Sequence, residues 1–92
     1  MISNKKIKQI AEKIGLNIDI IDLKTIQKGI NVEMEHGYIN PKTNITNNDI
    51  KKTMMIALAH IDEYPDYYDR LLKMEKRAKK YWSKKDKPNI WL

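Results

Sequence analysis

The chain of 92 residues has no cysteine, only three glycines and only three prolines. Without cysteine it can form no disulfide, no thiolate metal site and no cysteine nucleophile. So little glycine and proline argues against a loop-rich β-sandwich. No apolar run approaches the roughly 18 residues of a membrane-spanning helix, and the first residues lack the apolar stretch of a signal peptide. We therefore expect one small domain that is neither secreted nor embedded in a membrane.

Two familiar kinds of catalytic motif are also missing. The sequence contains no glycine-rich phosphate loop. Its two serines, Ser3 and Ser83, have no neighbouring histidine and aspartate, so a Ser-His-Asp nucleophile is not supported. The sequence therefore predicts no catalytic residues.

The formal net charge of +6 is carried entirely by the C-terminal end. Residues 1–72 hold ten basic and ten acidic residues, whereas residues 73–92 hold eight basic and two acidic residues. Such an end can contact phosphates or an acidic protein surface, or it can simply keep the chain in solution. Lysine outnumbers arginine there, so a contact with nucleic acid would be unspecific.

Apolar periodicity predicts an all-α fold of about four helices. The first helix is expected from Ser3, which can cap it, to Ile14. Gly15 follows as a natural C-terminal stop. A short connector with apolar anchors covers residues 16–21.

The second helix is expected to begin at Asp22 and to end before Gly37. Its apolar residues recur at helical spacing: Leu23, Ile26, Ile30 and Met34. Apolar and polar residues also alternate from residue 30 to 34, as in a half-buried strand, but the longer periodicity favours a helix. A turn-rich loop follows over residues 37–46.

The third helix is expected to open at Thr46, as cap, with Asp49 three residues later. Its predicted core stripe is Ile50, Met54, Ala57, Ile61 and Tyr64. The other sides are apolar as well, through Met55, Ile56 and Leu58. A helix that is apolar nearly all round is usually buried, so the pattern predicts that this helix is the central element.

The fourth helix follows at once, because Pro65 ends the third and Asp66 can cap the next, with Asp69 at its third position. Its predicted core stripe is Tyr67, Leu71, Met74, Ala78 and Tyr81. The pattern stops after Trp82. We therefore predict a helical domain over residues 1–82 and a basic tail over residues 83–92.

Both histidines have a carboxylate at helical distance. Glu33 and His36 are spaced i, i+3, and so are His60 and Glu63, in the opposite order. If the two helices pack antiparallel, the four side chains meet, and Gly29 lies where it would let the helices approach. Two imidazoles and two carboxylates can hold one divalent ion such as zinc, manganese or iron. The alternative is a metal-free buried network in which His60 bonds to Glu33 or to a tyrosine.

Two further groups of residues are candidates for partner binding. The corner at residues 62–69 combines acids with tyrosines, and the C-terminal end combines lysines with a tryptophan. The corner can fill the junction between two helices or contact a basic partner, including the lysine-rich end of a second copy. The predicted partner-binding residues are Tyr64, Asp66, Tyr67, Tyr68, Lys79, Lys80, Lys84, Lys85 and Trp91.

Two sequence blocks resemble a known family. The first is Gly29-Ile30-Asn31-Val32-Glu33-Met34-Glu35-His36-Gly37, and the second runs from Ile56-Ala57-Leu58-Ala59-His60 through Pro65-Asp66-Tyr67-Tyr68. They resemble a small domain of unknown function found in bacteriophages, large DNA viruses and bacteria. The similarity spans roughly residues 10–78, with Ile26 where an aromatic is usual. The resemblance implies a small helical fold and a viral setting, in the host cytoplasm or within the virion, but no established activity.

Three functions compete on this sequence. The first is a non-enzymatic interaction module, either a virion component or a binder of a host factor, whose partner is a viral or host protein or a second copy of itself. The second is a metal-dependent enzyme or metal binder, although a chain of this size leaves little room for a pocket. The third is an unspecific nucleic-acid binder, for which no motif is present. The sequence favours the first.

Overall fold

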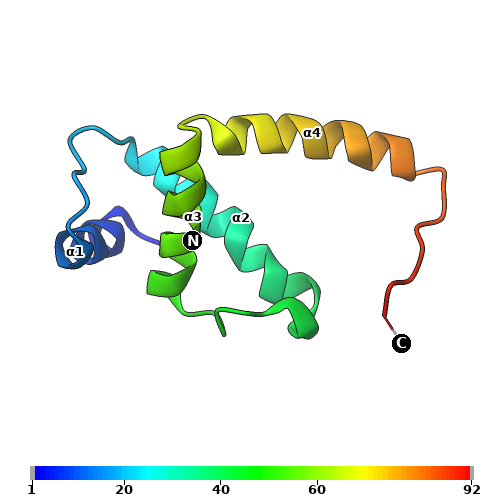
Figure 1. The fold of residues 1–92 in the computed structure, drawn as a ribbon, viewed down its shortest axis with the longest axis horizontal. Helices are drawn as coiled ribbons and strands as arrows, with labels where there is room; N and C mark the ends of the chain where they lie inside the picture. Colours follow the sequence, from blue (N-terminus) through cyan, green and yellow to red (C-terminus); the bar gives the residue numbers. More distant parts are fainter. Residues whose placement is uncertain (1, 92) are drawn as a thin grey trace.

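The computed structural model of the chain describes residues 2–91, and these form four α-helices and no strand. The helices are α1 (Asn4–Ile14), α2 (Leu23–Ile39), α3 (Ile50–Glu63) and α4 (Tyr67–Trp82), with a 3₁₀ turn, η1, over Pro41–Thr43. Figure 1 shows α3 crossing α2, with α1 at one end of the body and α4 leaving from the end of α3. The prediction of an all-α fold is confirmed.

Two groups of buried side chains form the core. The larger group lies between α1, α2 and α3 and consists of Ile7, Ile10, Ala11, Ile26, Ile30 and Met54. The smaller group lies where α4 begins and consists of Ala57, Ile61 and Tyr68. The larger group holds α1 to α2 and α3, whereas the smaller one holds only the start of α4.

Local signals fix both ends of α1 as predicted. The Ser3 hydroxyl accepts a hydrogen bond from the backbone N–H of Lys6, 3.2 Å away. Gly15 adopts a left-handed conformation with φ +77°, which ends the helix without steric cost. Asp22 caps α2 in the same way as Ser3 caps α1.

The predicted end of α2 is wrong, because the helix continues through Gly37 to Ile39. A β-carbon at Gly37 would lie 2.6 Å from Cγ of Asn44 and 2.8 Å from Oδ1 of Asn48. The glycine therefore lets the following loop pack against the helix. It does not end the helix.

The predicted start of α3 is also wrong. Asn47 and Asn48 have φ of 54° and 62°, a left-handed conformation that asparagine tolerates but a helix cannot contain. Asp49 is the actual cap, and its carboxylate accepts a hydrogen bond from the backbone N–H of Lys52. Thr46 instead lies 3.2 Å from the Thr53 hydroxyl.

Only one side of α3 is buried. Met54, Ala57 and Ile61 lie in the core as predicted, but Met55 and Ile56 are exposed on the opposite side. Tyr64, predicted at the end of the core stripe, is exposed as well. The apolar surface of α3 therefore extends beyond what the chain itself covers.

The prediction for α4 fails in a similar way. Its stripe begins on the body with the half-buried Tyr67 and Leu71, but Met74 and Tyr81 further along are more than half exposed. Figure 1 shows why, because the helix projects away from the body after its first turns. The one fully buried residue of α4 is Tyr68, which the predicted stripe did not include.

Residues 83–91 follow α4 and are exposed, whereas residue 92 of the predicted tail lies outside the described residues. Figure 1 shows residues 83–91 turning back toward the η1 end of the body. There the Lys42 ammonium lies 5.2 Å from the centre of the Trp91 ring. Within residues 2–91, no helix is long and apolar enough to cross a membrane.

Candidate functional site

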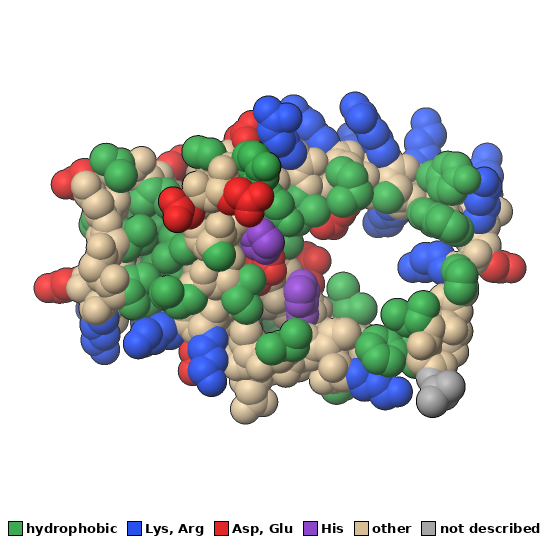
Figure 2. Space-filling view, in the orientation of Figure 1, with side chains coloured by type: hydrophobic (Ala, Val, Ile, Leu, Met, Phe, Trp, Pro, Cys, Tyr) green, Lys and Arg blue, Asp and Glu red, His purple; other side chains and the backbone are tan. Residues whose placement is uncertain are grey.

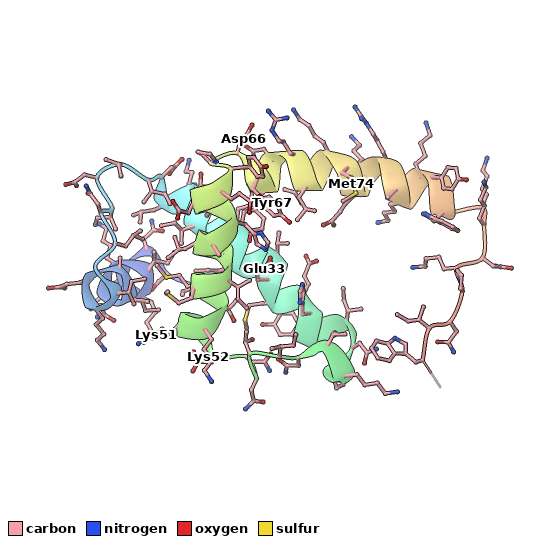
Figure 3. The ribbon with its side chains drawn as sticks, viewed as in Figure 1. Glu33, Lys51, Lys52, Asp66, Tyr67 and Met74 are labelled. Carbon is pink, nitrogen blue, oxygen red and sulfur yellow. The ribbon has the colours of Figure 1, made fainter. Side chains whose placement is uncertain are left out.

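A buried carboxylate lies where α2, α3 and α4 meet. Glu33, on α2, is 8% exposed, and Figure 3 shows it near Tyr67 on the inner side of the helix junction. The Tyr68 hydroxyl of α4 donates a hydrogen bond to Glu33 Oε1 over 3.1 Å. Burying a carboxylate is costly unless it receives hydrogen bonds, so this contact is needed where α4 joins the body.

Gly29 makes the space that the Tyr68 ring occupies. A β-carbon at Gly29 would lie 2.7 Å from Tyr68 Cε2 and 3.0 Å from the Ala57 β-carbon. Gly29 is one helical turn before Glu33, so the same face of α2 first accepts the ring and then its hydroxyl. The expectation that Gly29 permits a close approach is confirmed, and α4 takes part in that approach along with α3.

This position perturbs the ionisation of the tyrosine. Burial raises the pKa of Tyr68 well above its ordinary value, and the negative charge and hydrogen bond of Glu33 raise it further. All three effects favour the neutral hydroxyl, which can donate the hydrogen bond. Tyr68 therefore acts as a fixed donor and is no candidate for a reactive phenolate.

Both histidines lie beside the same carboxylate. The Nε2 atom of His36 is 3.8 Å from Glu33 Oε2, and the Nε2 atom of His60 is 3.7 Å from Glu33 Oε1. The His60 ring also stacks on Tyr67, with ring centres 4.3 Å apart and planes 6° from parallel. Three of the four predicted residues, Glu33, His36 and His60, therefore lie together in the structure. The distances suit ion pairs when the imidazoles are protonated, and they are too long for direct hydrogen bonds.

Glu63 does not join this group. It lies exposed at the end of α3, and no ion pair within residues 2–91 links it to either histidine. In that part of the chain, no group of three or more His, Asp or Glu side chains is arranged to hold a metal ion. The hydrogen bond to Glu33 comes from Tyr68, whereas the alternative network expected one from His60. The metal site stays a prediction.

The predicted partner-binding corner divides into inner and outer residues. Tyr64 and Asp66 are exposed, and Asp66 pairs with Arg70 at 2.8 Å. Tyr67 is half-buried against His60, and Tyr68 is 1% exposed, so both pack inward in this structure. The corner is mainly the junction between α3 and α4.

The predicted residues of the C-terminal end all lie on the surface. Lys79, Lys80, Lys84, Lys85 and Trp91 are exposed, and Figure 2 shows Lys and Arg side chains along the outer edge of α4. Lys85 donates a hydrogen bond to the Tyr81 hydroxyl. The periodicity did not reveal that Met74, Tyr81 and Trp82 are exposed with them.

Two open grooves differ in the sign of their charge. The first lies along α4 and is lined by Arg70, Lys73, Met74, Arg77, Ala78 and Tyr81, so all its charged residues are basic. The second, about 660 Å³, lies between the α1–α2 connector and the outer side of α3, and its charged residues, Asp22 and Asp62, are both acidic. Nothing in the sequence indicated the second groove beyond the surplus of apolar residues on α3.

The fold and this junction define a small helical domain with a buried Glu33–Tyr68 pair, two partly exposed histidines beside it and a projecting basic helix. A family model matches residues 7–77, and its description is "Protein of unknown function (DUF5661)". The chain therefore belongs to the DUF5661 family. Comparison with curated proteins and with solved structures finds no match.

Proposed function

We propose that this protein is a non-enzymatic interaction module that presents the projecting half of α4, residues 74–82, to a protein partner. In keeping with the viral setting that the sequence blocks imply, the partner is a virion protein or a host factor. The supporting observation is an amphipathic helix whose apolar stripe continues beyond the body that it is anchored to. Met74 is 53% exposed and Tyr81 is 56% exposed.

The stripe is continuous, and this is what makes its exposure informative. Tyr67, Leu71, Met74, Ala78 and Tyr81 recur at helical spacing, and the first two contact the body. The remaining three therefore face the same side of the helix as the body. Isolated apolar residues on a surface are common, whereas an ordered row flanked by basic residues is typical of a helix that binds a protein groove.

The basic groove along α4 indicates the chemistry of the partner. Arg70, Lys73 and Arg77 flank the apolar row on one side. A complementary surface offers an apolar groove with carboxylates at its edge. Nucleic acid fits less well, because the apolar row would gain nothing from phosphates.

The same geometry disfavours a membrane surface as the partner. Figure 2 shows most of the Lys and Arg side chains of α4 along its outer edge and a gap on the side that faces the body. A helix lying on a bilayer needs its apolar side toward the lipid with lysines beside it. Here a flat surface would meet the lysines first and would not reach the apolar row.

Site-specific photo-crosslinking tests the proposal. A photoreactive residue replaces Met74 in one variant and Lys76, on the opposite side of α4, in the matched control. In infected or host cells we expect one dominant protein adduct from position 74 and little from position 76. The adduct is identified by mass spectrometry, and the purified partner should bind Met74→Ser at least about tenfold more weakly than wild type. Equal crosslinking from both positions, or binding unaffected by Met74→Ser, would contradict the proposal.

A divalent metal site is the second candidate, favoured by one observation. Both histidine Nε2 atoms lie within 3.8 Å of the Glu33 carboxylate, and imidazole with carboxylate suits zinc, manganese or iron. Native mass spectrometry and thermal unfolding with added zinc test it. A resident metal predicts stabilisation by zinc that both His36→Ala and His60→Ala abolish. If zinc does nothing and only His60→Ala lowers the melting temperature, the cluster is a metal-free network.

A further inference from the structure

We infer that the surface matching the projecting half of α4 is present on the chain itself, so that α4 of one copy binds the acidic groove of a second copy. This inference rests on the proposed function and names its partner. The acidic groove lies between the α1–α2 connector and the outer side of α3. Figure 1 shows the α1–α2 connector at the other end of the molecule from the projecting half of α4, so α4 does not fill this groove within one chain.

Charge is the first observation that pairs the two surfaces. The charged residues lining the α4 groove, Arg70, Lys73 and Arg77, are all basic. Those lining the second groove, Asp22 and Asp62, are both acidic. Surfaces of opposite sign attract and orient each other, whereas two α4 helices packed side by side would bring like charges together. Charge therefore favours α4 against the groove over α4 against α4.

Unsatisfied apolar surface is the second observation. Apart from Asn17 and Thr25, the uncharged residues that line the acidic groove are apolar. Two of them, Ile20 and Met55, are 83% and 47% exposed. The α4 row supplies Met74 and Tyr81, which are likewise exposed. Both rows are uncovered in the single chain, and joining them would remove both from water.

The size of the groove agrees with such an occupant. The groove has a volume of about 660 Å³, which lies within the range of pockets that enclose a drug-sized ligand and leaves room for a few large side chains. Methionine, which α4 presents as Met74 and the groove as Met55, adapts its shape to irregular surfaces. The contact joins two different surfaces. Two copies can therefore form a closed two-fold pair with two such contacts, or successive copies can form a head-to-tail chain.

Sedimentation velocity over a concentration series tests the inference with two variants. Met74→Ser alters only the helix, and Met55→Ser alters only the groove. Both positions are exposed, so neither change should disturb the fold. We expect wild type to associate, more weakly as salt is added, and each variant to associate at least about tenfold more weakly. Leu72→Ser and Ile56→Ser, on exposed positions outside both grooves, are the matched controls and should behave as wild type.

Mixing the two variants gives the decisive result. The Met55→Ser copy keeps an intact helix and the Met74→Ser copy keeps an intact groove, so the mixture should form a one-to-one complex that neither forms alone. Wild type that stays monomeric at its highest soluble concentration would overturn the inference, as would a mixture that does not associate. Dissociation of the assembly by random duplex DNA that binds α4 more tightly would also overturn it, and would assign α4 to nucleic acid.

The two proposals fail in different ways. Suppose that wild type is monomeric but binds a crosslinked partner that Met74→Ser loses and Met55→Ser keeps. The interaction module then stands, and the second copy is not its partner. If neither self-association nor partner binding depends on Met74, both proposals fail.

Discussion

Replacing Tyr68 by phenylalanine isolates one hydrogen bond at the junction. The ring keeps its place against Gly29, and only the hydroxyl that donates to Glu33 over 3.1 Å is lost. Hydrogen bonds to charged groups contribute about 1.5–3 kcal/mol, and the carboxylate left behind is 8% exposed and poorly placed to recover that bond from water. We expect the free energy of unfolding to fall by about 2 kcal/mol. For a domain of this size that lowers the melting temperature by roughly 8–16 °C.

Chemical denaturation followed by circular dichroism measures this change. Tyr64→Phe is the matched control, because Tyr64 is 56% exposed and removal of an exposed hydroxyl costs only hydrogen bonds to water. It should alter the free energy by no more than about 0.5 kcal/mol. If Tyr68→Phe changes stability as little as Tyr64→Phe does, the buried hydrogen bond does not stabilise the junction, and the reasoning about Glu33 is wrong.

Alkaline pH gives an independent check on the same pair. In the unfolded chain the Tyr68 hydroxyl ionises near pH 10, whereas burial and Glu33 raise its pKa in the folded chain. Above pH 10 the unfolded chain therefore binds fewer protons than the folded chain, and stability falls as pH rises. The contribution of the raised Tyr68 pKa to the free energy of unfolding is therefore fully present below pH 10. Wild type should lose about 1.4 kcal/mol per pH unit more than Tyr68→Phe above that point, and parallel curves for the two proteins would contradict the raised pKa.

Three other changes test the packing around α4. Gly29→Ala should destabilise the protein by about 1–2 kcal/mol despite the better helix propensity of alanine, because the added methyl would press on the buried Tyr68 ring; an unchanged melting temperature would contradict that close packing. Lys28→Met should raise the pKa of Asp69, which is held low by a hydrogen bond and the charge of Lys28, and an NMR titration of the Asp69 side chain measures the shift. Deleting residues 84–92 should leave the melting temperature within about 2 °C of wild type, because these residues are exposed up to residue 91. A larger loss would mean that the tail stabilises the body.

The parts of the fold that were predictable are those set by local chemistry. Ser3 and Gly15 bound α1 because a cap needs only the neighbouring backbone, so the signal is complete in the sequence. The start of α3 was mispredicted because Thr46 and Asp49 are both good caps. The choice between them depends on the left-handed turn at Asn47 and Asn48, which the spacing of residues does not reveal.

The environment of α4 was not predictable from its own periodicity. The apolar stripe shows that one side of the helix is apolar, and it consists of Tyr67, Leu71, Met74, Ala78 and Tyr81. The same sequence pattern arises whether the chain's own core or another molecule covers that side. The core is too small to cover more than the first turns of this helix. How far the core covers α4 depends on the whole fold, and the sequence of the 16 helix residues alone does not show it.

The candidate site was predicted in part for a related reason. Spacing of i, i+3 places Glu33 beside His36 on one helix, and this holds wherever the helix lies. The partner from α3 depended on where the helices cross, and the crossing admits His60 but leaves Glu63 in solvent. The donor Tyr68 comes from a third helix, and its position follows from the missing side chain of Gly29.

The buried Glu33–Tyr68 pair and the projecting helix are physically linked. Two polar contacts join the first turn of α4 to α2: the hydrogen bond from Tyr68 to Glu33 and the ion pair between Lys28 and Asp69 at 2.6 Å. An apolar contact alone tolerates sliding, whereas a buried hydrogen bond has a required length and direction. Glu33 and Tyr68 therefore constrain the angle at which α4 leaves the body. If α4 binds a partner as proposed, that binding depends on the angle, and Tyr68→Phe should then weaken binding although Tyr68 touches no partner.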